Sequence, residues 1–188
     1  MTSKKNNLVV DVTIEIPKDS KTKYEYDRKS GKIRVDRILF GANAYPQNYG
    51  FIPECLDWDG DELDVLVYAQ QSFQPGTIVP TRILGAMEMI DDGETDTKLI
   101  GVIDCDPRFA NKTSLKDLPE HTLKEIKNFF ETYKLLQNKK VIVKDFKDTN
   151  WAIREYNECV QLMKKYGSMD KAHFIKEMMK KYPSKYKA

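Results

Sequence analysis

An acidic stretch in the first half of the chain carries the side chains best suited to chemistry. Residues 57–64 contain four Asp, one Glu and a Gly, and residues 65–67 continue as the apolar run Val-Leu-Val. The first part is typical of a tight turn, and the second part is typical of a buried strand. In an extended segment Asp59 and Asp61 point the same way. Asp64 lies among apolar neighbours, where an unpaired carboxylate is costly.

A bound cation is the simplest way to offset the repulsion between carboxylates that lie close together at the start of a strand. Because the ligands are oxygens, the cation should be hard, Mg²⁺ before Zn²⁺. The calcium-binding loop of an EF-hand does not match this stretch. Whether its loop starts at Asp57 or Asp59, the position that requires Gly is acidic, and the closing acid position holds Tyr68 or Gln70. The alternative of a solvated acidic loop stays open at this point.

The composition is that of a soluble globular protein. The chain has 188 residues, of which 40% are hydrophobic and 32% charged. No apolar run is long enough to span a membrane, and no signal peptide is visible. Three widely spaced cysteines favour a reducing, cytoplasmic location over a disulfide scaffold. With only His121 and His173, a His-based zinc site or a Ser-His-Asp triad has little to draw on.

The net charge of +2 is unevenly distributed. Residues 164–188 hold eight Lys against Asp170 and Glu177, a net +6, which leaves about −4 for the rest of the chain. A basic tail can contact nucleic acid or anionic lipid. We favour the more common interpretation, the solvated face of a terminal helix.

Alternating apolar and polar residues predict a β-rich first hundred residues. Strands are expected over 8–16, 21–27, 32–37, 64–68, 77–89 and 98–104, with a further strand at 141–143. Ser30-Gly31 is a plausible hairpin turn, and the acidic stretch 91–98 is typical of a hairpin tip. These strand spacings suit a small barrel.

Helical spacing dominates the rest of the chain. One helix opens at Leu118-Pro119 with Pro in its first turn, a second is capped by Thr149 and ends at Gly167, and a third is capped by Asp170. Without a linker or composition break, we expect a single domain over 1–188, with about 167–188 as a basic helical C-terminal extension. The expected fold class is α+β with a mainly β core.

Other polar stretches add to the acidic one. Glu15, Lys23, Glu25, Arg34 and Arg37 lie on the polar registers of consecutive early strands, where they can face a common cleft. The alternative is cross-strand ion pairing on a solvent face. A turn-rich aromatic segment, 45–51, precedes the acidic stretch, and its tyrosines are alternatively core residues with hydroxyls at the surface.

Taken together, these residues indicate a polyanionic substrate. The chain holds more acids than one metal needs, alongside Lys, Arg and Tyr donors suited to phosphate oxygens. It shows no evident nucleophile–base pair. A negatively charged substrate, bridged by several Mg²⁺ and attacked by a metal-activated water, would use both sets of residues.

The sequence closely resembles the soluble family I inorganic pyrophosphatases of bacterial type. The resemblance spans roughly residues 8 to 165 and rests on several segments in order. These are Glu15-Ile16-Pro17, Lys23-Tyr24-Glu25, Val35-Asp36-Arg37, Tyr45-Pro46-Gln47-Asn48-Tyr49-Gly50, Asp59-Gly60-Asp61-Glu62-Leu63-Asp64-Val65, Asp91, Asp96-Thr97-Lys98 and Phe129-Phe130-Glu131-Thr132-Tyr133-Lys134.

The resemblance implies a fold, a reaction and a set of roles. The fold is a small, OB-like closed β-barrel with flanking C-terminal helices, and the reaction is Mg²⁺-dependent hydrolysis of pyrophosphate to two phosphates. Several Mg²⁺ are expected per site, and other divalent cations are possible. Asp61 would accept the proton from the attacking water. The metal set would be Asp59, Asp64, Asp91, Asp96, Glu15 and Glu25, with Asp64 bridging two metals and the two Glu acting mainly through water or through ordering the site. The phosphate-binding set would be Lys23, Arg37, Tyr49, Lys98, Tyr133 and Lys134.

The resemblance also implies an oligomer. Bacterial members commonly form hexamers, helped by histidines on the first long helix, where this chain has Asn128 and Thr132. A homohexamer is still the expected assembly, without nucleic acid or membrane as partners.

Three other functions compete with this one. A nucleic-acid-binding barrel is disfavoured because carboxylates in the cleft repel a phosphate backbone. An enzyme that uses an Asp-x-Asp pair on a nucleotide sugar lacks the expected glycine patterns. A catalytically dead relative is disfavoured because all the acidic residues are present.

Overall fold

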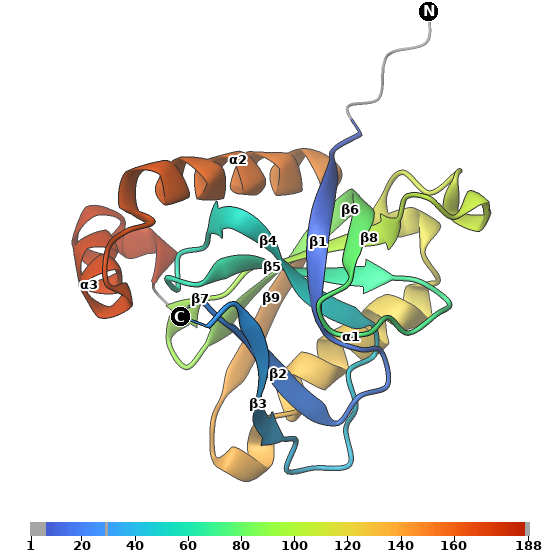
Figure 1. Ribbon diagram of the computed structural model, residues 1–188, viewed down its shortest axis with the longest axis horizontal. Coiled ribbons are helices and arrows are strands. Elements are labelled where there is room, and N and C mark those ends of the chain that lie inside the picture. Colours follow the sequence, from blue (N-terminus) through green and yellow to red (C-terminus); the bar gives the residue numbers. More distant parts are fainter. Residues whose placement is uncertain (1–6, 29, 187–188) are drawn as a thin grey trace, which may run out of the picture.

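The computed structural model describes residues 7–28 and 30–186, and its centre is a closed β-barrel. Strands pair in the order β1-β4-β5-β8-β6, and β6 returns to pair with β1, which closes the barrel. The β5–β8 pair is parallel, whereas the other pairs of the barrel are antiparallel. Closure leaves no free sheet edge in the barrel itself. The prediction of a small closed barrel within an α+β fold is confirmed (Figure 1).

The elements follow one another in an order that places strands before helices. The strands are β1 (Val9–Ile16), β2 (Thr22–Asp27), β3 (Lys32–Ile38), β4 (Asn48–Leu56), β5 (Glu62–Tyr68), β6 (Ile78–Asp91), β7 (Glu94–Thr95), β8 (Lys98–Ile103) and β9 (Val141–Lys147). The α-helices are α1 (Glu120–Thr132), α2 (Thr149–Tyr166) and α3 (Lys171–Lys181). Short 3₁₀ turns lie at Pro107–Phe109, Leu115–Asp117, Leu135–Gln137 and Pro183–Lys185.

Helices cover the barrel on two sides. Helix α2 contacts β4 and β6, and helix α1 contacts β9. Figure 1 shows α2 along one side of the strands and α1 on the other, while the β2–β3 ribbon projects from the barrel. Alternation along β1 explains the local fold, because Val10, Val12, Ile14 and Ile16 are buried. No helix in the described residues is long and apolar enough to cross a membrane.

Strand β4 is the element that the sequence reasoning missed. The segment 45–51 was expected to be turn-rich because it contains Pro46, Asn48 and Gly50, yet β4 begins at Asn48 and pairs with both β1 and β5. Gly50 is required by close packing, since a Cβ there would lie 2.1 Å from the Thr13 carbonyl oxygen. A glycine inside a strand often marks such a close approach of two backbones.

Two helix starts also differ from expectation. The side chain of Asp148, not Thr149, caps α2 by accepting from the Trp151 amide. The Thr149 hydroxyl instead donates to the Leu84 carbonyl at 2.7 Å. Pro119 occupies the position before the first helical residue of α1. The cap of α3 is confirmed, because Asp170 accepts from the His173 amide.

Candidate active site

The acidic stretch forms a tight turn that leads into β5. The Asp57 amide donates to the Asp61 carbonyl at 2.7 Å, and the Gly60 amide donates to the Asp57 carbonyl at 3.1 Å. Gly60 has φ of 84°, a conformation that favours glycine. Within the turn, the Asp61 amide donates to Asp59 Oδ1 at 3.0 Å. Asp59 and Asp61 line one pocket as expected, but through a turn and not through an extended segment.

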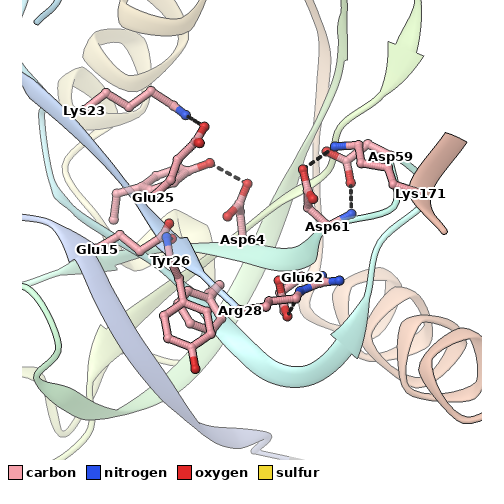
Figure 2. A pocket seen from close by; sticks show the side chains of 12 residues that line it. Glu15, Lys23, Glu25, Tyr26, Arg28, Asp59, Asp61, Glu62, Asp64 and Lys171 are labelled. Carbon is pink, nitrogen blue, oxygen red and sulfur yellow. Dashed lines mark hydrogen bonds and ion pairs between the residues drawn. The ribbon is translucent and has the colours of Figure 1, made fainter. Parts of the chain in front are cut away.

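Two adjoining pockets collect most of the predicted site residues. The first has a volume of about 400 Å³, and its lining includes Glu15, Lys23, Glu25, Tyr49, Asp59, Asp61 and Asp64 (Figure 2). The second has a volume of about 270 Å³, and its lining includes Asp59, Asp91, Asp96 and Lys134. Asp59 lines both, so the two pockets form one continuous site. Side chains from β1, β2, β4, β5, the end of β6 and the turns beside them meet there.

Lys98 lies beneath the site and joins its two halves. Its ammonium forms ion pairs with Asp64 and Asp96, and its side chain is only 4% exposed. The Tyr49 hydroxyl donates to the same oxygen of Asp64. Burial opposes the charge on Lys98, but the two carboxylates outweigh it, so the pKa of Lys98 is raised well above its ordinary value. Lys98 therefore stays protonated.

The positive charges nearby do not neutralise three carboxylates of the site, those of Glu15, Asp59 and Asp96. Burial, with the Asp64 charge, raises the pKa of Glu15 to about 8. Burial, with the charges of Asp96 and Asp61, raises the pKa of Asp59 to about 8. Burial and Asp64 also raise the pKa of Asp96, although Lys98 opposes the shift. Crowded oxygen ligands that hold their protons this strongly fit a hard divalent cation, which would restore the balance.

Some predicted residues lie away from these two pockets. In the described part of the chain, neither pocket is lined by Arg37 or Tyr133. Arg37 pairs with Asp36, and its buried Nε has no partner among the described residues. Tyr133 is buried, with Lys134 Nζ 5.3 Å from its ring centroid. Arg34 also lines neither pocket and pairs with Asp27 of the neighbouring strand at 3.4 Å, so for this residue the structure fits the alternative of cross-strand ion pairing.

A second acidic group lies close to the turn but is held by protein donors. Asp57, Glu155 and Cys159 are all buried and bring their ligand atoms within 4.8 Å of one another. Asp57 accepts from the Trp58 and Thr97 amides, and Glu155 accepts from the Trp58 indole and from Lys185. These bonds account for the carboxylates without a cation. Through these bonds the group connects the turn to α2 and to the C-terminal segment.

Two ion pairs at the site were missed from the sequence. Arg28 Nε lies 2.7 Å from Glu62 Oε1 at the rim of the first pocket. Lys171, from α3, pairs with Asp61 (Figure 2). The basic tail was interpreted as a solvated helix face, and that interpretation is wrong for Lys171. The sequence carries no signal for this contact, because Lys171 is 110 positions from its partner.

Comparison with known proteins identifies the family. The inorganic pyrophosphatase family matches residues 12–164. The chain is 72% identical to the inorganic pyrophosphatase of Malacoplasma penetrans over 95% of this chain and 99% of that protein. It is 60% identical to the Mycoplasma pneumoniae enzyme over 96% of this chain and 98% of that protein. The chain belongs to the inorganic pyrophosphatase family.

The structure agrees with that assignment. The inorganic pyrophosphatase of Thermus thermophilus superposes with a TM-score of 0.81 at 41% identity, covering 87% of this chain and 95% of that chain. The Helicobacter pylori enzyme gives a TM-score of 0.80 at 42% identity, covering 87% of this chain and 96% of that chain. As a member of this family, the chain is a hydrolase of pyrophosphate.

Proposed function

We propose that this pyrophosphatase hydrolyses pyrophosphate by Mg²⁺-dependent attack of a water molecule, within the continuous site formed by the two acidic pockets. The observation that carries the proposal is the convergence of five aspartates in the lining of the two pockets, two of which share the buried Lys98. The five are Asp59, Asp61, Asp64, Asp91 and Asp96. Several Mg²⁺ are expected, and other divalent cations can substitute. When bound, the cations supply Lewis acidity, lowering the pKa of water and neutralising the phosphates.

The acidic residues divide into ligands and a base. Asp59, Asp64, Asp91 and Asp96 would hold the cations directly, with Asp64 bridging two of them. Glu15 and Glu25 would act mainly through water or through ordering the site. Asp61 belongs to the turn and, at 57%, is more exposed than Asp64, Asp91 and Asp96, so it is the group best placed to accept the proton of the attacking water.

The cationic and phenolic donors would bind the two phosphoryl groups. Lys23, Tyr49, Lys98 and Lys134 line the pockets or lie directly beneath them. Arg37 and Tyr133 lie outside the lining, and the unpartnered buried Nε of Arg37 supports a role as a donor to substrate. These donors stabilise the negative charge that develops on the leaving phosphate.

Phosphate release with and without Mg²⁺ tests the reaction, and two variants test the roles. Asp61→Asn keeps the shape of the side chain but cannot take a proton, so we expect hydrolysis to fall about 10²–10⁴-fold with Mg²⁺ binding largely intact. Asp64→Asn removes the bridging ligand and should weaken Mg²⁺ binding. Isothermal titration with Mg²⁺ separates the two, and equal loss of metal binding in both variants would refute the assignment.

We also propose a cytoplasmic homohexamer of single-domain subunits that binds neither nucleic acid nor membrane. Membership of the family supports the assembly. The free thiols of Cys55, Cys105 and Cys159 support a reducing compartment. Sedimentation of the purified protein, with and without Mg²⁺, tests the assembly. A filter-binding assay with single-stranded oligonucleotides tests the alternative ligand.

A further inference from the structure

The C-terminal segment, residues 168–186, packs against the turn that carries Asp59 and Asp61. This segment follows the end of the family match at residue 164 and contains α3. Phe174 and Met178 of α3 are buried in a cluster with Leu56, Trp58 and Leu162. The Tyr186 hydroxyl donates to the Trp58 carbonyl at 2.6 Å. Trp58 immediately precedes Asp59, so these contacts fix the turn from its outer side.

Lys171, the first residue of α3, lies on the turn itself. A Cβ placed on Gly60 would lie 2.9 Å from Lys171 Cγ and 3.4 Å from Phe174 Cδ1. The aliphatic stem of Lys171 therefore covers the glycine between the two aspartates. The position of the lysine is set by packing along its stem as well as by its charge.

The ammonium of Lys171 reaches the carboxylate of Asp61. Nζ pairs with Asp61 Oδ2, while the backbone amide of Asp61 donates to Asp59 Oδ1 (Figure 2). Lys171 lines both acidic pockets, as Asp59 does. The ammonium of Lys171 thus places a positive charge from the C-terminal segment between the two pockets.

We infer that the C-terminal segment is part of the active site, and that Lys171 is a positioning residue for Asp61. The inference rests on the proposed role of Asp61 as the base. Lys171 binds one oxygen of Asp61 and so restricts the side-chain conformations of this exposed carboxylate. The other oxygen is left to accept the proton of the attacking water. Lys171 itself transfers no proton.

The size of the effect follows from the exposure of the pair. The side chains of Lys171 and Asp61 are 49% and 57% exposed, so the pair is of the weak surface kind. A surface ion pair of this kind changes the population of the side-chain conformation that it stabilises by about two- to fivefold. We therefore expect kcat to fall by about this factor when the ammonium is removed. Binding of Mg²⁺ and of pyrophosphate should be unchanged, because Lys171 holds the base and neither ligand.

Lys171→Met is the test, because it keeps the aliphatic stem over Gly60 and removes the charge. Lys171→Arg restores a cation and should restore kcat. The matched control is Lys181→Met. Lys181 is 48% exposed and pairs with Glu177 within α3, but it lines neither acidic pocket. Each full-length protein is assayed for kcat and KM with Mg²⁺, and titrated with Mg²⁺ by calorimetry.

The expected result is a lower kcat in Lys171→Met alone, with rescue by Arg and with the same KM and Mg²⁺ affinity in all variants. An unchanged or higher kcat would overturn the inference, as would a change confined to KM or an equal loss of kcat in Lys181→Met. Lys171→Gln provides the same comparison if Met disturbs folding. Activity of the wild type, together with its loss in Asp61→Asn, tests the proposed function separately. A failure of the Lys171 prediction can therefore be distinguished from a failure of the proposed function.

Discussion

Replacing Lys98 with Met should destabilise the protein strongly, and divalent cations should reverse much of the loss. Lys98 Nζ is the shared partner of Asp64 and Asp96, whose side chains are only 20% and 10% exposed. Met has nearly the same length and removes only the charge. The two carboxylates would then be left in a poorly solvated site without their cation.

The magnitude follows from the burial of the ion pairs. Removing one partner from a buried pair costs about 3–5 kcal/mol. Protonation of Asp96, whose pKa burial already raises, relieves part of that cost, so we expect about 3 kcal/mol. For a chain of this size, each kcal/mol changes the Tm by about 2–4 °C. The Tm in EDTA should therefore fall by about 6–12 °C.

Scanning calorimetry in EDTA and in Mg²⁺ tests this prediction. Lys139→Met removes the same charge from a pair that is half exposed, and should change the Tm by less than about 4 °C. Mg²⁺ should reduce the difference in Tm between Lys98→Met and the wild type, because it supplies positive charge to the same carboxylates. The prediction fails if the Tm of Lys98→Met falls no further than that of Lys139→Met, or if Mg²⁺ does not raise it towards the wild-type value. Either result would show that Asp64 and Asp96 do not need a cation beside them.

Three further predictions test the electrostatics and the packing. Glu15 and Asp59, with pKa values of about 8, hold protons in the folded chain that the unfolded chain releases, so stability without divalent cations should fall as the pH rises from about 4.5 to 8. Urea unfolding in EDTA across that window measures the slope, and a rising stability would contradict the assignment. Phe174→Ala removes the largest buried ring of α3 and should cost about 3–5 kcal/mol by urea unfolding, while a loss below 1 kcal/mol would mean that α3 is not anchored there. Gly50→Ala forces a Cβ to 2.1 Å from the Thr13 carbonyl oxygen and should separate β4 from β1, seen as lost amide protection in both strands.

The barrel could be predicted where burial follows strand alternation. In β1, every second residue is buried, and the sequence pattern therefore predicts the element and the face it buries. In β4, buried residues run consecutively from Asn48 to Ile52, because Gly50 lets β1 approach closely and helix α2 contacts the strand. A period-2 pattern is absent there, so the turn-forming residues dominated the prediction.

The candidate site could be predicted only where its residues lie close together in sequence or match the family pattern. The turn 57–61 and the strand after it place Asp59, Asp61 and Asp64 together through local geometry alone. The contacts of Lys98 with Asp64 depend on the parallel pairing of β5 with β8, which sequence spacing does not reveal. Lys171 depends on how α3 folds back over the turn, and this is a tertiary contact without a local signal.

The charge balance of the site links its stability to its function. Lys98 is buried close to Asp59 and Asp96, whose pKa values remain raised, which means that the nearby cations of the protein do not neutralise these carboxylates. Such a cluster costs folding free energy that a purely structural region would avoid by apolar substitution. The cost is offset when a ligand that binds only the folded chain supplies the missing positive charge, by about 2.7 kcal/mol at a ligand concentration of 100 Kd. The same imbalance that would draw divalent cations into the pockets would therefore make the stability of the folded barrel depend on them.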